Sequence, residues 1–203
     1  MIMENEKRIR DLLKNRKLRS ETDPNNYQLY EKRLLEAFQM KRDSNLEYFY
    51  PNTFEGSDRE DYLACRKIFD GKDWNQIDFD SLYINHVQFL MLNEHGVIYY
   101  LPAFLRYFYD LRRLDSEFFN SIMGKLSQGL CVPTSDQLQI AIQERKYPVA
   151  PADFSAFERL NPIQSKLVAV FLVNVANLLP TDWFDSSEAQ RALTNYWGNF
   201  LLF

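Results

Sequence analysis

The feature that most constrains the fold is an apolar segment with a proline near its centre, VIYYLPAFLRYFY at residues 97–109. Apolar side chains recur in and just beyond it at alternating intervals of four and three residues: Val97, Leu101, Phe104, Phe108 and Leu111. This is the spacing of one face of an α-helix. Pro102 falls on the opposite, amphipathic edge, where its missing N–H is expected to bend the helix or restart it. The segment therefore predicts a central helix that is buried over most of its circumference.

A second apolar helix is predicted near the C-terminus. Asn161 followed by Pro162 is a helix start, because asparagine caps the free backbone N–H groups and proline suits the first helical position. The sequence IQSKLVAVFLVNVANLL follows, and Pro180 ends the helix. The chain has only six glycines among 203 residues and no convincing alternating strand pattern. We therefore predict an all-α fold, a single globular multi-helix bundle of seven to nine helices around these two apolar helices.

Other helix boundaries follow from capping patterns. A helix is expected over about 27–42, a second starts at the capping box Ser57–Glu60 and ends at Gly71, and a third starts near Asp80. Asn93 is expected to cap the helix that contains Pro102. Further helices are expected over about 116–127, from Thr134, and from Asp185 or Ser186 to the apolar side chains Leu193, Tyr196, Trp197 and Phe200.

Charge divides the chain into a basic arm and an acidic body. Residues 1–22 hold seven Lys/Arg and four Asp/Glu, a net charge of +3. The remainder holds 24 − 7 = 17 basic and 28 − 4 = 24 acidic residues, a net charge of −7. We predict a basic helical arm over 1–22 and one all-α domain over 23–203. The arm could lie on a phosphate backbone or an anionic membrane surface, or its stripe of Ile9, Leu12 and Leu13 could pack on the body.

The N-terminal segment lacks the apolar core of a signal peptide, and no uncharged stretch reaches the roughly 18 to 20 residues that a membrane span needs. The two cysteines, Cys65 and Cys131, have no metal-binding spacing and form no disulfide framework. A cytoplasmic protein without a membrane span is expected.

Sequence motifs of catalysis or metal binding are missing. His86 and His95 are nine residues apart and lack the Glu-x-x-His pattern of di-iron bundles. DGKDWNQIDFD at 70–80 has its glycine at the second position of the calcium-loop template rather than the sixth, and Ser81 stands where that template needs glutamate. Neither a phosphate-binding P-loop nor a G-x-S-x-G elbow is present. No catalytic residue, metal or cofactor is predicted, although a Cys–His pair assembled by the fold stays open.

The segment 70–80 is a candidate for partner binding, because its four aspartates flank Trp74 and Phe79. Aromatic anchors supply buried area and carboxylates steer a basic partner. The predicted partner-binding residues are Asp70, Asp73, Trp74, Asp78, Asp80, Tyr99, Arg106 and Tyr109. In the alternative interpretation, Trp74 belongs to the core and the aspartates merely face water.

Three motifs suggest relatives: FxGKxW at 69–74, YYLPAFL at 99–105, and LNxxQ at 160–164 followed by an apolar helix. Over residues 27–179 the chain resembles a family of small uncharacterised bacterial helical proteins, a domain of unknown function; the basic arm and the final aromatic helix depart from its pattern. The resemblance implies a bacterial, cytoplasmic, single-domain helical protein, and it assigns no catalytic residue.

Together these observations predict a non-catalytic protein-binding module, specifically an immunity-type protein that neutralises a basic bacterial toxin domain. One alternative is a nucleic-acid-associated regulator that uses the basic arm. Another is an enzyme with a pocket near Tyr99, Arg106 and Tyr109. The sequence does not predict an oligomeric state.

Overall fold

A computed structural model describes residues 27–50, 56–84, 91–106, 122–123, 126–127, 156–178 and 184–202. Contacts divide the chain into two compact units. One comprises Pro24–Ile122 and is called the α7 unit; the other comprises Met1–Asp23 with Met123–Phe203 and is called the α11 unit. The single domain over 23–203 stays a prediction, because this division does not test whether each unit folds alone.

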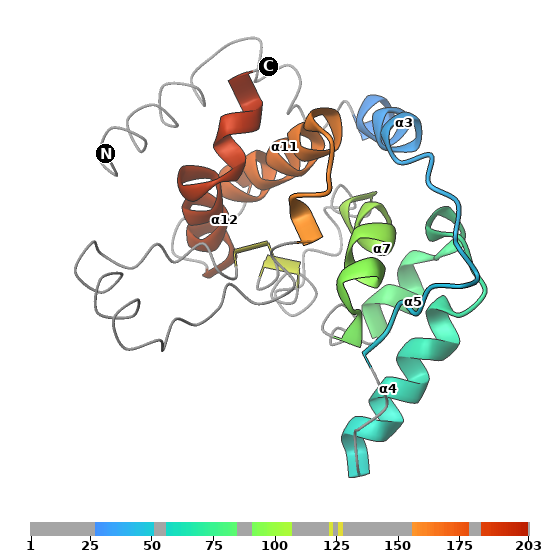
Figure 1. Cartoon of the computed structure of the whole chain (residues 1–203). Helices are drawn as coiled ribbons and strands as arrows, with labels where there is room; N and C mark the ends of the chain where they lie inside the picture. Colours follow the sequence, from blue (N-terminus) through green and yellow to red (C-terminus); the bar gives the residue numbers. More distant parts are fainter. Residues whose placement is uncertain are drawn as a thin grey trace, which may run out of the picture. The chain divides into compact units, whose positions relative to one another are not determined.

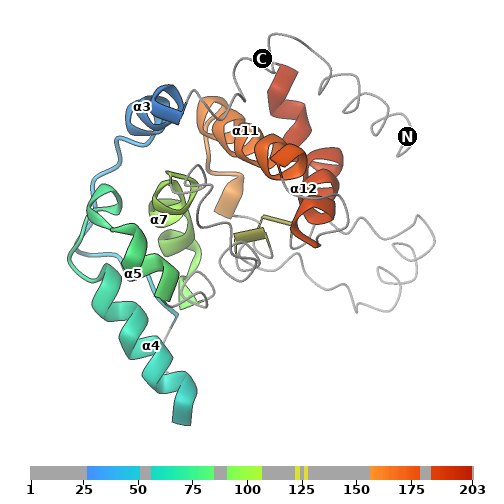
Figure 2. The same cartoon turned by 180° about the vertical axis from the view of Figure 1, so that it is seen from behind.

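The described residues confirm the all-α fold class, since their only β pairing is an isolated bridge between Phe49 and Leu92. They contain six α-helices, against seven to nine predicted for the whole chain. The α7 unit holds α3 (Tyr27–Ala37), α4 (Gly56–Phe69), the 3-10 helix η2 (Trp74–Gln76), α5 (Phe79–Ile84) and α7 (Glu94–Arg106) (Figures 1 and 2). The α11 unit holds α11 (Pro162–Leu178), α12 (Phe184–Asn195) and the 3-10 helix η5 (Trp197–Leu202).

Capping explains where several helices begin and end. The Oδ1 atom of Asn161 accepts hydrogen bonds of 3.0 Å from the amides of Ile163 and Gln164, and Oε1 of Gln164 accepts from the Asn161 amide. Pro162 is the first residue of α11, which confirms the predicted start. Gly71 has a φ of 75° just after α4, as its predicted role at the helix end requires.

Two other boundaries differ from the prediction. α3 ends at Ala37 rather than near residue 42. Phe38 follows it as a buried side chain, so the apolar stripe continues beyond the helix itself. α4 begins at Gly56, one residue before the predicted cap.

The start of α7 is held against the segment that precedes α4. The Tyr50 amide donates to Met91 O at 3.2 Å, and the Asn93 amide donates to Tyr48 O at 3.2 Å. The Asn93 side chain caps α7 through the Gly96 amide at 3.0 Å and also donates to the carbonyls of Glu47 and Phe49. A Cβ atom on Gly96 would lie 2.0 Å from Tyr48 O, so the two backbones approach more closely than a side chain allows.

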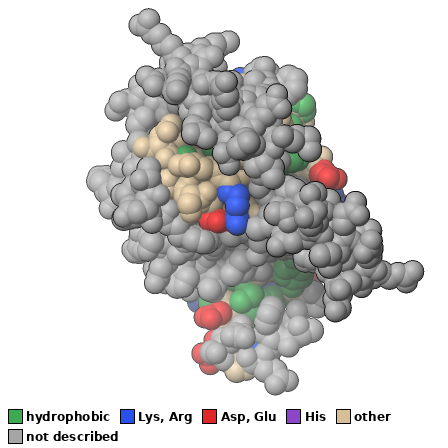
Figure 3. All heavy atoms as spheres, turned by 90° about the vertical axis from the view of Figure 1, so that its left-hand side faces the viewer, with side chains coloured by type: hydrophobic (Ala, Val, Ile, Leu, Met, Phe, Trp, Pro, Cys, Tyr) green, Lys and Arg blue, Asp and Glu red, His purple; other side chains and the backbone are tan. Residues whose placement is uncertain are grey.

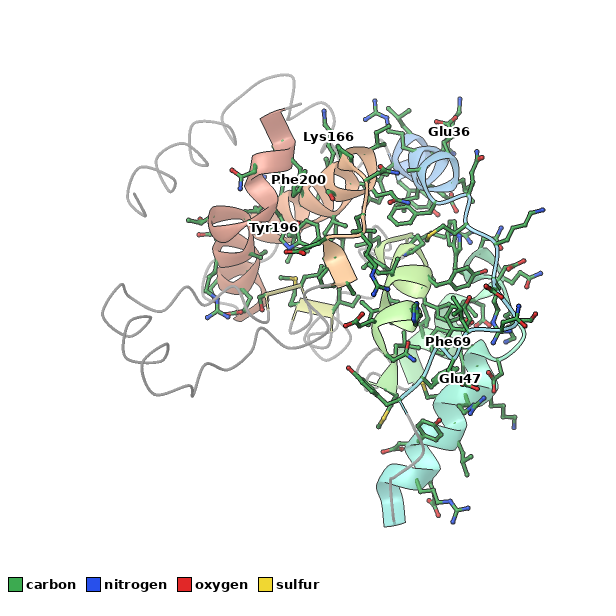
Figure 4. The ribbon with its side chains drawn as sticks, in the orientation of Figure 1. Glu36, Glu47, Phe69, Lys166, Tyr196 and Phe200 are labelled. Carbon is green, nitrogen blue, oxygen red and sulfur yellow. The ribbon has the colours of Figure 1, made fainter. Side chains whose placement is uncertain are left out.

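α7 is continuous through Pro102, so the predicted restart at that residue is wrong. In its described part, the edge expected to be amphipathic is mostly buried: Tyr99 and Pro102 have interior positions, and Arg106 is partly exposed. Aromatic rings surround the helix: the ring of Phe69, labelled in Figure 4, lies 4.6 Å from that of Tyr100 and 6.1 Å from that of Phe104.

The α11 unit is built on an aliphatic helix that contacts both α12 and η5. α11 is buried continuously from Leu167 to Ala176. The Ser186 hydroxyl at the start of α12 donates to Ala176 O, and the fully buried Trp197 donates from Nε1 to Leu126 O at 3.1 Å. Both predicted apolar helices are therefore buried in their units.

Several sequence predictions lie outside the described residues. They are the arm over 1–22, His86, Tyr109, Cys131, the helix from Thr134, and all but four residues of the helix over 116–127. In the part of the chain that is described, no helix combines the length and the hydropathy that crossing a lipid bilayer requires.

Candidate partner-binding surface

Seven of the eight predicted partner-binding residues are described, and all seven lie in the α7 unit. η2 contacts α7, and this contact brings Asp73 to Tyr99 and Asn75 to Arg106. Two segments separated by about 25 residues in sequence thus lie side by side in the fold, and their role in partner binding stays a prediction. The remaining residue, Tyr109, lies outside the described residues.

Asp73 is exposed but firmly positioned. It caps η2 in a capping box with Gln76, whose side chain accepts from the Asp73 amide at 2.8 Å. The Tyr99 hydroxyl donates to Asp73 Oδ1 at 2.6 Å. Burial raises the pKa of Tyr99, and the hydrogen bond to Asp73 raises it further, so the phenol stays a proton donor at neutral pH.

Trp74 does not act as a surface anchor. Its side chain is only 3% exposed, and its Nε1 donates to Phe38 O at 3.0 Å. This position corrects the expectation of an exposed aromatic residue in the segment 70–80. The ring instead fixes η2 to the chain that follows α3, because a buried indole N–H needs an acceptor.

Arg106 joins three parts of the α7 unit. Its Nε donates to Glu31 Oε1 of α3 at 2.5 Å, and its Nη1 donates to Asn75 O at 3.2 Å. Tyr27 belongs to the same group, since its pKa is raised by burial and by its hydrogen bond to Glu31. The charge of Arg106 is therefore already compensated within the fold.

Asp78 and Asp80 are exposed at the beginning of α5. Asp78 accepts hydrogen bonds from the Ser81 amide at 2.8 Å and from the Ser81 hydroxyl at 2.7 Å. These bonds to Ser81 lower the pKa of Asp78 below its ordinary value, so its carboxylate is ionised at neutral pH. Because the donors are uncharged, the negative charge of Asp78 stays available at the surface.

Asp70 differs from the other aspartates because cations hold it. Arg66 Nε donates to its Oδ2 at 2.9 Å, and Arg42 Nη2 lies 3.7 Å from its Oδ1. The pair Arg66–Asp70 can be read from the sequence as an i, i+4 pair on a helix. The sequence did not predict that Arg42 lies beside Asp70 or that Glu31 pairs with Arg106. These partners are far apart in the chain and meet only through the fold.

The candidate acidic surface is thus limited to the exposed carboxylates of Asp73, Asp78 and Asp80, because Asp70, although exposed, is paired with Arg66. Within the described residues, no three His, Cys, Asp or Glu side chains are arranged to hold a metal ion. The described side chains of the α11 unit form no comparable group of exposed carboxylates. Its Glu188 is instead paired with Arg191. Figure 3 shows the side of the molecule that includes α12, where basic and acidic side chains lie next to each other.

Comparisons of the chain with protein-family models, with curated proteins and with solved structures find no match.

Proposed function

We propose that the chain is a non-catalytic protein-binding module, an immunity-type protein that binds and neutralises a basic partner such as a bacterial toxin domain. The observation that supports this function is the group of exposed carboxylates of Asp73, Asp78 and Asp80. Asp73 is held by its capping box and the Tyr99 hydroxyl, and Asp78 is held by Ser81. Carboxylates held in place steer a cationic protein and lose little entropy on binding. Aromatic contact area would have to come from residues other than Trp74.

A pull-down with salt-dependent elution tests this function. The wild-type chain should recover one cationic protein from its host, and raising the salt concentration should weaken the complex steeply. The triple variant Asp73→Asn/Asp78→Asn/Asp80→Asn should bind at least about tenfold more weakly. Asparagine caps helices as well as aspartate does, so this variant keeps the fold while removing charge.

The matched control is Glu36→Gln/Glu60→Gln/Asp61→Asn, which removes three exposed carboxylates elsewhere in the α7 unit. It should leave the affinity within about twofold, because none of these three carboxylates belongs to the proposed surface and exposed charges away from a contact are screened by salt. A partner whose binding resists salt, or equal loss in both triple variants, would rule out the proposed surface.

A second function is favoured by the net charge of +3 over residues 1–22, a basic arm on an acidic chain. We propose as an alternative that this arm contacts nucleic acid in a regulatory role. A gel-shift experiment at low salt should then show a complex for the full-length chain and none after removal of residues 1–22. Equal mobility of nucleic acid with both proteins would exclude this role.

Other expectations from the sequence are kept as proposals. We propose a cytoplasmic, bacterial protein of the helical family described above, with seven to nine helices in one domain. A conserved polar cavity beside Tyr99 and Arg106 would instead favour an enzyme, although both groups already bond to protein partners.

A further inference from the structure

Two arginines of the α7 unit rest on buried aromatic rings. The Cζ atom of Arg42 lies 5.0 Å from the centroid of the Tyr48 ring, and that of Arg66 lies 5.2 Å from the centroid of the Phe49 ring. Both rings are 3% exposed, so the guanidinium groups cover the edge of the aromatic core. Stacking of this kind fixes the plane of a guanidinium group before any ligand arrives.

The two guanidinium groups share one carboxylate. Arg66 forms a hydrogen-bonded ion pair with Asp70, whereas the distance of 3.7 Å from Arg42 Nη2 to Asp70 Oδ1 is too long for a hydrogen bond. Two positive charges and one negative charge leave a net charge of +1. The sequence Pro24–Ile122 around them has 11 Lys/Arg and 16 Asp/Glu, hence 11 − 16 = −5. The cluster is therefore a local positive group in an acidic unit.

The hydrogen-bonding capacity of the two arginines is only partly used. Arg42 Nε is buried without a hydrogen-bond partner, and its guanidinium otherwise interacts with the Tyr100 hydroxyl. The second bond of Arg66, from Nη1 to the Tyr62 hydroxyl, is long at 3.5 Å. Each guanidinium group carries five N–H donors. The side chains of Arg42, Arg66 and Asp70 are 23%, 35% and 41% exposed, so a small anion can reach them.

We propose that Arg42 and Arg66 bind a phosphate group, with Asp70 as an internal competitor that holds the two guanidinium groups in place. A phosphate offers more acceptor oxygens and more charge than the carboxylate that Asp70 already supplies. It can accept from both arginines at once, and one of its negative charges offsets the net charge of +1 that remains beside Asp70. This site uses none of the three carboxylates of the proposed partner surface, so its test does not depend on the proposed function.

The experiment is a titration of the full-length chain with inorganic phosphate at constant ionic strength, followed by the NMR signals of the arginine Nε–H groups. Saturable shifts of the Arg42 and Arg66 signals are expected, and acetate should bind at least about tenfold more weakly than phosphate. Arg42→Gln and Arg66→Gln should each weaken phosphate binding about tenfold. Arg42→Lys should also weaken it, because lysine keeps the charge but lacks the two-pronged donor.

Two variants make the test specific. Lys32→Gln changes the net charge as Arg42→Gln does, at an exposed pair with Glu36 on α3, and should leave the affinity within about twofold. Asp70→Asn should tighten phosphate binding several-fold, because it removes the competing charge. Circular dichroism checks that each variant is folded. Absence of saturation, equal binding of acetate, equal loss in Lys32→Gln, or weaker binding in folded Asp70→Asn would each overturn the proposal.

Discussion

α7 and α11 are both buried helices, but they are held in different ways. α7 is surrounded by aromatic side chains whose polar atoms have defined acceptors: the Tyr100 hydroxyl lies 2.9 Å from Phe69 O, and the Tyr99 hydroxyl bonds to Asp73. α11 buries a continuous run from Leu167 to Ala176 that is aliphatic except for Phe171 and Asn174. The hydroxyl of Ser165 is buried in the same helix without a partner. Directional contacts specify one arrangement around α7, whereas volume and hydrophobicity dominate around α11.

The sharpest test of the directional region is Gly96→Ala. The added Cβ would lie 2.0 Å from Tyr48 O, so the bridge between residues 48–50 and 91–93 must open. We expect a loss of about 4 kcal/mol in the free energy of unfolding, measured by urea denaturation. Gly71→Ala is the control: unlike Gly96, Gly71 has open space around its Cβ position. Only its φ of 75° would be strained by alanine, at a cost of about 1 kcal/mol. Similar losses in the two variants would contradict the close approach.

A change in side-chain volume tests whether α11, unlike α7, depends mainly on how much apolar volume it buries. Leu172→Ala in α11 removes buried methyl groups and should cost about 3 kcal/mol, because the cavity does not close. Leu172→Met keeps the volume and should cost less than about 1.5 kcal/mol. Urea denaturation measures both values. A loss in Leu172→Met as large as in Leu172→Ala would mean that α11, too, depends on specific shape.

Tyr100→Phe keeps the ring and removes only the hydroxyl group. The variant leaves the carbonyls of Phe69 and Lys72, which lie 2.9 and 3.2 Å from the hydroxyl oxygen, without this donor. We expect a loss of about 1–2 kcal/mol in the free energy of unfolding. An unchanged value would show that the ring, rather than its hydrogen bonds, holds α7.

Ser165→Ala removes a hydroxyl group from α11 and should have the opposite sign. The Ser165 hydroxyl is buried and unpartnered, and alanine has the higher helix propensity. We expect a gain of about 0.5–1 kcal/mol in the free energy of unfolding. Destabilisation in thermal or urea unfolding would show that the hydroxyl contributes to packing.

The smallest effect on stability at neutral pH is expected from the titration of Cys65 and Tyr99 in the α7 unit. Burial raises the pKa of Cys65 from 9.0 to about 12 and also raises that of Tyr99. Because both groups bind their protons more tightly when folded, their contribution to stability is complete below about pH 9 and is lost as the pH rises toward 12. In a Cys131→Ser background, thiol labelling at pH 8 should therefore require unfolding. Rapid labelling of the native chain would contradict the burial of Cys65.

Local patterns in the sequence predicted several of the described helices and three of their caps. Asn161, Gly71 and Asn93 act where their capping chemistry indicated, because a cap depends on residues within one helical turn. The sequence could not predict that Trp74 bonds to Phe38 O or that Arg106 meets Glu31, since 36 and 75 residues separate these partners. The expectation that Trp74 is exposed was wrong for the same reason. Its segment is rich in aspartate, which suggests a surface position, but the ring is buried and its hydrogen-bond acceptor, Phe38 O, lies in another part of the chain.

The side chain of Asn93 has a consequence for how the chain assembles. Its oxygen caps α7, and its nitrogen bonds to two carbonyls 44 and 46 residues earlier. Aspartate would keep the cap and lose both donors, and serine is too short to serve both ends, so residues that are interchangeable at an ordinary cap are not interchangeable here. We therefore expect the first turn of α7 to reach its final form only when this loop closes, so that completion of the helix start depends on a non-local contact with an entropic cost.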